Sequence, residues 1–101
     1  MDIGYLWEKL HGSVFSLISG SSYKDRLESA YMNLAFIPAE QVPAEIRDDF
    51  NEVMQLVRTA KPDGTEGRIK AAVRSMDDEQ RYMMAKKILY MYDKITRMDR
   101  R

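Results

Sequence analysis

The chain has 101 residues, of which 45% are hydrophobic and 32% are charged, and it contains no cysteine. This length and composition predict a single globular domain over residues 1–101, and the lack of cysteine excludes a disulfide framework and a thiolate metal site. No apolar run is long enough to cross a bilayer, and the first residues lack the basic lead of a signal peptide, so we expect a cytoplasmic protein.

The charges balance overall but not along the chain. Residues 1–57 hold four basic and nine acidic side chains, whereas residues 58–101 hold twelve basic and seven acidic ones. The two parts therefore carry net charges of −5 and +5. Two interpretations stay open: the parts fold together and neutralise each other in part, or the basic part meets an acidic partner.

Helical spacing of apolar residues predicts two helices in the first third of the chain. The first runs from about Ile3 to Ser19, and Gly20 is expected to end it in the left-handed conformation. Ser21 or Ser22 can cap the second helix, because a serine hydroxyl accepts from free amides at a helix start. The prolines at positions 38 and 43 end this helix and open a third. The apolar side of that third helix comprises Ile46, Phe50, Val53, Met54 and Val57.

The second part of the chain begins with a turn over residues 61–64, where proline presets φ and glycine supplies a left-handed residue. Thr65 is expected to cap a short fourth helix. Asp77 and Gln80 have the spacing of a capping box, which predicts that the last and longest helix begins there and runs to about Met98. These elements predict an all-α protein without a sheet, a compact bundle of about five short helices that pack antiparallel.

The last helix carries two lines of apolar residues that together cover roughly half of its circumference. The expected core stripe comprises Tyr82, Ala85, Ile88, Leu89, Tyr92 and Ile95, and the second line comprises Met84, Met91 and Met98. Such a helix either lies at the centre of the bundle or faces another subunit. The three methionines are the candidate protein interface, because methionine adapts to irregular contacts, and filling gaps in the core is the alternative.

A basic set on the same helix offers a different kind of contact. It comprises Lys87, Tyr90, Lys94, Arg97 and Arg101, with Met83 among them and Lys86 and Arg100 nearby. Cations beside an exposed aromatic ring can contact phosphates and stack on a base. Asp93 and Asp99 interrupt the set and the whole chain is neutral, so nucleic acid is the less favoured partner.

An acidic group on the third helix is the strongest sequence candidate for chemistry. It comprises Glu45, Asp48, Asp49 and Glu52. Acids three or four residues apart share a helix face and can hold magnesium, which gives a magnesium-dependent nucleotide hydrolase as a remote alternative. A solvated helix face is the favoured interpretation. His11, the single histidine, has no recognisable nucleophile or orienting group and is expected at the edge of the first apolar stripe.

The sequence therefore favours a small, non-enzymatic protein–protein interaction module, such as an adaptor, an inhibitor or a regulatory subunit, that acts through helix faces. We expect a protein partner or self-association, and neither a metal, a cofactor nor a membrane. The alternative is a nucleic-acid-associated regulator that uses the basic side of the last helix.

Overall fold

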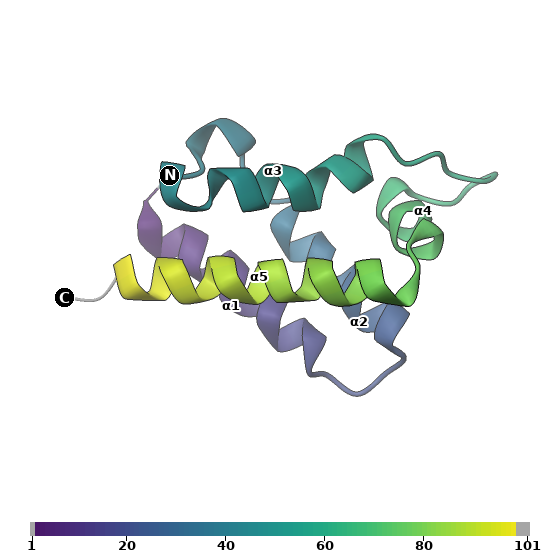
Figure 1. Ribbon diagram of the computed structural model, residues 1–101, viewed down its shortest axis with the longest axis horizontal. Coiled ribbons are helices and arrows are strands. Elements are labelled where there is room, and N and C mark those ends of the chain that lie inside the picture. The colour runs from purple at the N-terminus through teal and green to yellow at the C-terminus, as the bar shows by residue number, and fades with distance from the viewer. Residues whose placement is uncertain (1, 99–101) are drawn as a thin grey trace.

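Helices make up the secondary structure of residues 2–98, the part of the chain that the computed structural model describes (Figure 1). In order they are α1 (Ile3–Leu17), α2 (Tyr23–Leu34), a 3-10 helix η1 (Ala39–Gln41), α3 (Ala44–Arg58), α4 (Arg68–Ser75) and α5 (Asp78–Met98). No strand occurs in this part of the chain, so the predicted all-α bundle is confirmed.

Three helix starts follow from side chains that accept hydrogen bonds from free backbone amides. Asp2 Oδ1 accepts from Tyr5 N at 2.9 Å, and Ser22 Oγ accepts from Asp25 N at 3.2 Å. At α5 the predicted capping box is confirmed, because Asp77 Oδ1 accepts from Gln80 N at 2.8 Å and Gln80 Oε1 accepts from Asp77 N at 3.1 Å. Each cap satisfies amides that have no partner within the helix.

Two predicted boundaries are wrong. α1 ends at Leu17, where Ile18 N donates to Phe15 O at 3.2 Å in a tightened last turn, and Gly20 does not adopt a left-handed φ. α4 begins at Arg68 after Gly67, so Thr65 does not cap it. The predicted turn is confirmed at Gly64, whose φ of 57° lies in the left-handed region that favours glycine.

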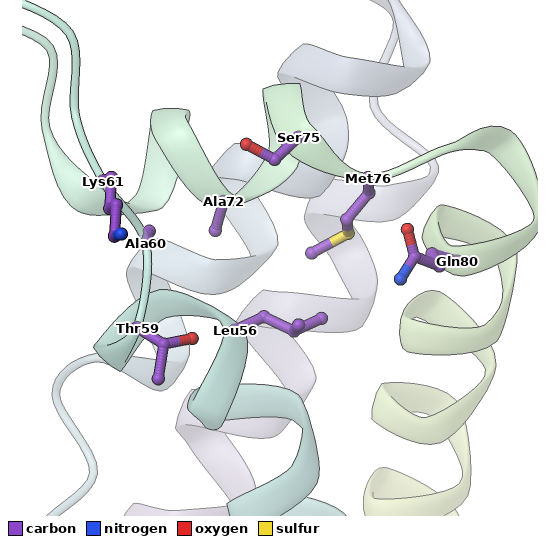
Figure 2. A pocket seen from close by; sticks show the side chains of 8 residues that line it. All are labelled: Leu56, Thr59, Ala60, Lys61, Ala72, Ser75, Met76 and Gln80. Carbon is purple, nitrogen blue, oxygen red and sulfur yellow. The ribbon is translucent and has the colours of Figure 1, made fainter.

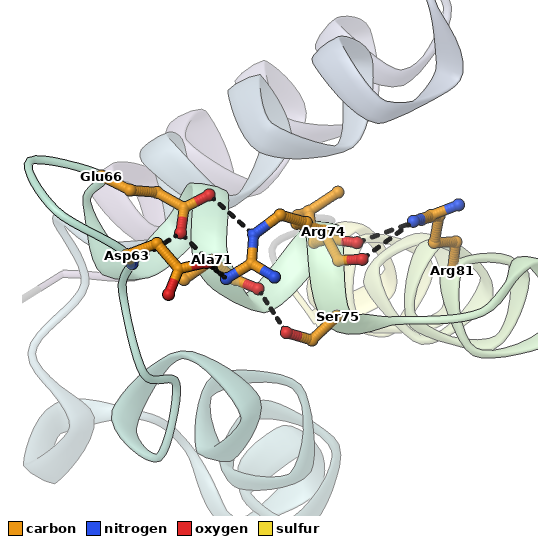
Figure 3. Close-up of polar contacts among 7 residues, drawn as sticks. Asp63, Glu66, Ala71, Arg74, Ser75 and Arg81 are labelled. Carbon is orange, nitrogen blue, oxygen red and sulfur yellow. Dashed lines mark hydrogen bonds and ion pairs between the residues drawn. The ribbon is translucent and has the colours of Figure 1, made fainter.

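Arginine side chains hold α4 in place instead of a capping residue (Figure 3). Arg74 donates from Nε and Nη2 to the two carboxylate oxygens of Glu66, at 2.9 and 3.0 Å, and thereby fixes the segment before the helix. At the other end, Arg81 Nε donates to Val73 O at 3.1 Å and Arg81 Nη1 donates to Asp78 at 3.0 Å. Arg81 Nη2 also donates to Arg74 O at 3.4 Å, so α5 supplies donors to carbonyls in the last turn of α4.

The last helix, α5, packs on α1 and α3 and leaves one side uncovered. It runs antiparallel to α1 and to α3, contacts both, and lies nearest the viewer in Figure 1 with no other helix in front of it. α2 packs on α1, and both pass behind α5 in this view, while α4 closes one end of the molecule against α2 and α3. At the opposite end Trp7 Nε1 donates to Thr96 Oγ1 at 2.9 Å and joins the start of α1 to the end of α5.

The core gathers side chains from all five α-helices and from the segment with the two prolines. The largest fully buried side chains are Tyr31, Phe50, Leu6, Leu10, Leu27, Leu34, Ile46, Ile88, Met91, Ile95, Val42 and Val53. Two polar side chains inside the core are paired: Tyr31 OH donates to Val53 O at 3.1 Å, and Ser13 Oγ donates to Ala30 O at 2.8 Å. Burial raises the pKa of the Tyr31 phenol, so this donor keeps its proton over the whole ordinary pH range.

Candidate interaction surface

Two of the three methionines predicted to form an interface lie in the core. Met91 is fully buried and Met84 is 7% exposed, and both belong to the cluster that includes Ile88 and Ile95. These four residues follow one another at spacings of four, three and four along α5, which is the seam that fills the space between α1 and α3. The interface prediction is therefore wrong for Met84 and Met91, and only Met98 is exposed.

The outward side of α5 carries residues that the sequence pattern places in the core. Tyr82 and Leu89, two members of the predicted core stripe, are exposed by 58% and 47%. The orientation of α5 explains the difference, because the helix turns its methionine line inward and this stripe partly outward. The apolar part of the circumference of α5 is wider than the side of the helix that α1 and α3 cover.

Large apolar side chains gather on the outward sides of α1 and α5, which are neighbouring antiparallel helices. We call this surface the α1/α5 outer face, and its exposed residues are Phe15, Ile18, Tyr82, Met83, Leu89 and Tyr90. Ile18 directly follows α1, and Met83 lies at the edge of the face nearest α3, where it lines a pocket with Glu52. Their exposed fractions run from 39% to 72%. Single exposed apolar residues are normal on a protein surface, but a group on adjoining helices is typical of an interaction site.

A shallow groove of about 270 Å³ runs between the two helices within this face. Its lining comprises Leu17, Ile18, Tyr82, Ala85, Lys86 and Leu89. Five of these six side chains bring aliphatic or aromatic carbon to the groove, and lysine adds a cation at the end of an apolar stem. The groove is thus suited to an apolar side chain of a partner.

Lys86 lies at the middle of the outward side of α5. Its neighbours on the helix surface, three and four residues away in each direction, are Tyr82, Met83, Leu89 and Tyr90. Lys86 Nζ lies 5.5 Å from the ring centroid of Tyr82 and 5.9 Å from that of Tyr90. Within the described residues no carboxylate forms an ion pair with this ammonium group, whereas Lys87 pairs with two.

Aromatic rings extend the face toward the start of α1. Trp7 and His11 stack with ring centroids 4.7 Å apart, and Tyr92 of α5 lies 5.9 Å from each of them. His11 also lies 6.1 Å from Phe15. The histidine occupies the edge of the α1 stripe, as expected, and it forms part of a row of aromatic rings.

The structure disperses the predicted basic set. Lys87 lies between helices, Arg97 pairs with Asp93 at 3.2 Å, and Lys94 Nζ lies 3.5 Å from the carbonyl oxygen of Glu45. Tyr90 alone belongs to the α1/α5 outer face, while Arg101 lies outside the described residues. Most of these cations therefore already have acceptors within the protein, which reduces what they can offer to phosphates.

The acidic group on α3 is divided by its neighbours. Lys87 Nζ lies 3.3 Å from Glu52 and 3.6 Å from Asp49, whereas Glu45 and Asp48 are exposed. The two carboxylates, Glu52 foremost, raise the pKa of Lys87 above its usual range. Two members of the acidic group thus hold α3 against α5. No three His, Asp or Glu side chains within residues 2–98 gather as a possible metal site.

A cavity of about 280 Å³ lies where α3, α4 and the start of α5 meet (Figure 2). Leu56, Ala72 and Met76 give it an apolar floor, and the remaining lining comprises Thr59, Ala60, Lys61, Ser75 and Gln80. The hydroxyls of Thr59 and Ser75 donate to carbonyls of their own helices, at 2.8 and 2.9 Å. This lining offers no carboxylate, imidazole or thiol for acid, base or nucleophile chemistry.

The α1/α5 outer face is the best candidate site, and sequence reasoning found only its edge. The signal that could have located it is the set of four large apolar residues around Lys86 at helical neighbour positions. Comparisons add no assignment, because no protein-family model, no curated protein and no solved structure matches this chain. None of the described helices has the length and apolar character needed to span a membrane.

Proposed function

We propose that this protein is a small, non-enzymatic interaction module, such as an adaptor, an inhibitor or a regulatory subunit, that binds a protein through the α1/α5 outer face. The observation that carries the proposal is the exposure of Phe15, Ile18, Tyr82, Met83, Leu89 and Tyr90 on two adjoining helices. Burying an apolar surface of this kind against a partner lowers the free energy, because it removes that surface from water.

The chemistry of the face also favours a protein partner. Tyrosine and methionine are enriched in the cores of protein interfaces, where charged residues are depleted. Tyr82 and Tyr90 supply large contact areas, and the groove beside Leu89 accepts an apolar side chain. Asp93 and Arg97 supply part of the polar border typical of such interfaces, and Lys86 places one cation among the apolar side chains.

The test compares partner capture by the wild-type protein with capture by a variant of the face. Tagged wild-type protein and the Tyr82→Glu/Leu89→Glu variant are used in parallel on an extract of the native host, followed by mass spectrometry. The matched control is Met32→Glu/Phe36→Glu, which changes two side chains of similar exposure that lie in α2 and directly after it, outside the α1/α5 outer face. Circular dichroism and the melting temperature establish that all three proteins are folded.

We expect a stoichiometric protein that the wild type and the control capture and the face variant does not. Partners retained equally by all three proteins would contradict the proposed location of the interface. Nuclease-sensitive nucleic acid as the main captured species would overturn the proposal and favour the nucleic-acid alternative.

A further inference from the structure

The outward side of α5 has the pattern of a second helix-packing seam. Tyr82, Lys86, Leu89 and Asp93 follow one another at spacings of four, three and four residues. This is the spacing by which one α-helix packs lengthwise on another, and the inward seam of Met84, Ile88, Met91 and Ile95 repeats it on the opposite side. The inward seam is covered by α1 and α3, whereas no helix of the described chain covers the outward one.

The charges on this outward seam are complementary when two copies of the seam pack antiparallel. Lys86 and Asp93 are two turns apart on one side of α5, and the midpoint between them falls between Leu89 and Tyr90. Two α5 helices packed antiparallel about that midpoint bring each Lys86 opposite Asp93 of the partner subunit. The same arrangement puts Leu89 against Leu89 of the partner subunit, and Tyr90 against Tyr90 of the partner subunit.

The groups involved are available for such contacts. Lys86 has aromatic rings near its ammonium group but no carboxylate partner in the described part of the chain. Asp93 pairs with Arg97 within α5, and their side chains are 55% and 76% exposed, so this pair contributes little and can exchange. The pair between Lys86 and Asp93 of the partner subunit forms twice in each dimer, so each Lys86 ammonium group gains a carboxylate partner.

The available area suits a dimer of this size. At roughly 200 Å² for a fully exposed large side chain, the α1/α5 outer face presents about 650 Å² of apolar residue surface per chain. A standard interface buries about 800 Å² per partner, and the stems of Lys86 and Arg97 add to the apolar contribution. With 21 residues, α5 is about 31 Å long, which lets the contact extend over several turns.

We infer that the partner of the α1/α5 outer face is a second copy of this chain, bound with the two α5 helices antiparallel about a twofold axis between Leu89 and Tyr90. The inference rests on the proposed function, because it assigns a partner to the same surface. Such a contact is isologous, so the same residues serve both subunits and the assembly closes as a dimer.

The decisive experiment reverses each of the two charges in turn. Sedimentation equilibrium of the full chain, from low micromolar to submillimolar concentration, gives the dimer dissociation constant of each variant. Lys86→Glu places two carboxylates at each contact, and Asp93→Lys places two ammonium groups there. We expect each variant to raise the Kd by roughly tenfold or more, because two attractive pairs become two repulsive ones.

Recombination of the charges identifies the geometry. An equimolar mixture of the Lys86→Glu and Asp93→Lys chains is expected to form a heterodimer, since both contacts then join opposite charges. The Lys86→Glu/Asp93→Lys double variant is expected to recover the wild-type dimer. A parallel arrangement would place Lys86 against Lys86 of the partner subunit and Asp93 against Asp93 of the partner subunit. Each single charge reversal would then keep like charges in contact, so the Kd would not rise. Lys24→Glu and Asp48→Lys, two exposed charge reversals elsewhere, serve as controls and are expected to leave the Kd unchanged.

A cross-linking measurement tests the axis independently. Because the chain has no cysteine, Leu89→Cys introduces a single thiol near the axis, and Met32→Cys introduces one away from it. A short bis-maleimide is expected to link two Leu89→Cys chains and not two Met32→Cys chains. A wild-type chain that stays monomeric throughout the concentration range, or a dimer insensitive to the charge exchange, would overturn the second copy as partner. Neither result would contradict the proposed function, because the capture experiment can still identify a different protein that binds the same face.

Discussion

At the scale of single residues, chemically similar side chains on α5 have opposite environments. Met83 and Met84 are neighbours in the sequence, yet Met83 is exposed and Met84 is buried. Lys86 and Lys87 differ in the same way, because one lies over aromatic rings at the surface and the other pairs with Asp49 and Glu52 of α3. Successive residues of an α-helix point in directions 100° apart, so residue type alone does not decide whether such a side chain is buried.

Replacement of a methionine by alanine is expected to separate the two environments. Met91→Ala should lower the free energy of unfolding by about 2–5 kcal/mol, because it removes a fully buried side chain and leaves a cavity. Met83→Ala should change it by less than about 0.5 kcal/mol, because the side chain lies at the surface. Urea denaturation followed by circular dichroism measures both values. Equal effects would contradict the inward orientation of the methionine line.

At the scale of elements, the sequence predicts the helices better than it predicts the sides that they bury. Helix existence depends on local spacing and capping, and Ser22 and the Asp77–Gln80 box are where they were predicted. The buried side of α5 depends on how α1 and α3 approach it, which no local pattern contains. The apolar arc of α5 is wide enough for either side to face inward. The pattern therefore predicts Tyr82 and Leu89 in the core and leaves Met84 and Met91 open between an interface and the core, where the structure places them. The short helix η1 escaped prediction because three residues between prolines carry no periodic signal.

The ion pair that holds the segment before α4 should make the stability of the protein depend on pH. The Arg74 guanidinium holds the pKa of Glu66 below its ordinary value, with a smaller contribution from the amide of Asp63. A carboxylate with a lowered pKa stabilises the folded state above its ordinary pKa, and the contribution is lost as pH falls through the lowered value. Glu66→Gln should therefore lower the melting temperature at neutral pH. The difference from wild type should shrink in acid, and a difference independent of pH would contradict this role.

At the scale of the whole molecule, α5 joins the two oppositely charged parts of the chain. Lys87 belongs to the basic part, and its partners Asp49 and Glu52 belong to the acidic part. Mutual neutralisation, one of the two interpretations of the charge pattern, therefore occurs between α3 and α5. It involves only part of the charge, and Lys86 on the outward side takes no part in it.

Replacement of Lys87 tests this link between the two parts. Lys87→Gln should lower the free energy of unfolding at neutral pH by up to about 1 kcal/mol, since the group is partly exposed and screened by water. The pKa of Lys87 is raised, so its contribution is complete below the ordinary lysine pKa and is lost as pH rises through the raised value. Thermal melts at increasing salt concentration should show the variant and the wild type converging, and an effect unchanged by salt would contradict an electrostatic origin.

The packing of α5 between α1 and α3 has a consequence for the order in which the protein is made. Ribosomes synthesise this helix after α1 to α4, although it supplies Met84, Ile88, Met91 and Ile95 to the core that α1 and α3 share. Until these residues leave the exit tunnel, α1 and α3 expose the apolar sides that α5 later covers. Folding of the nascent protein is therefore delayed until α5 is free, and in that interval the chain depends on protection from aggregation.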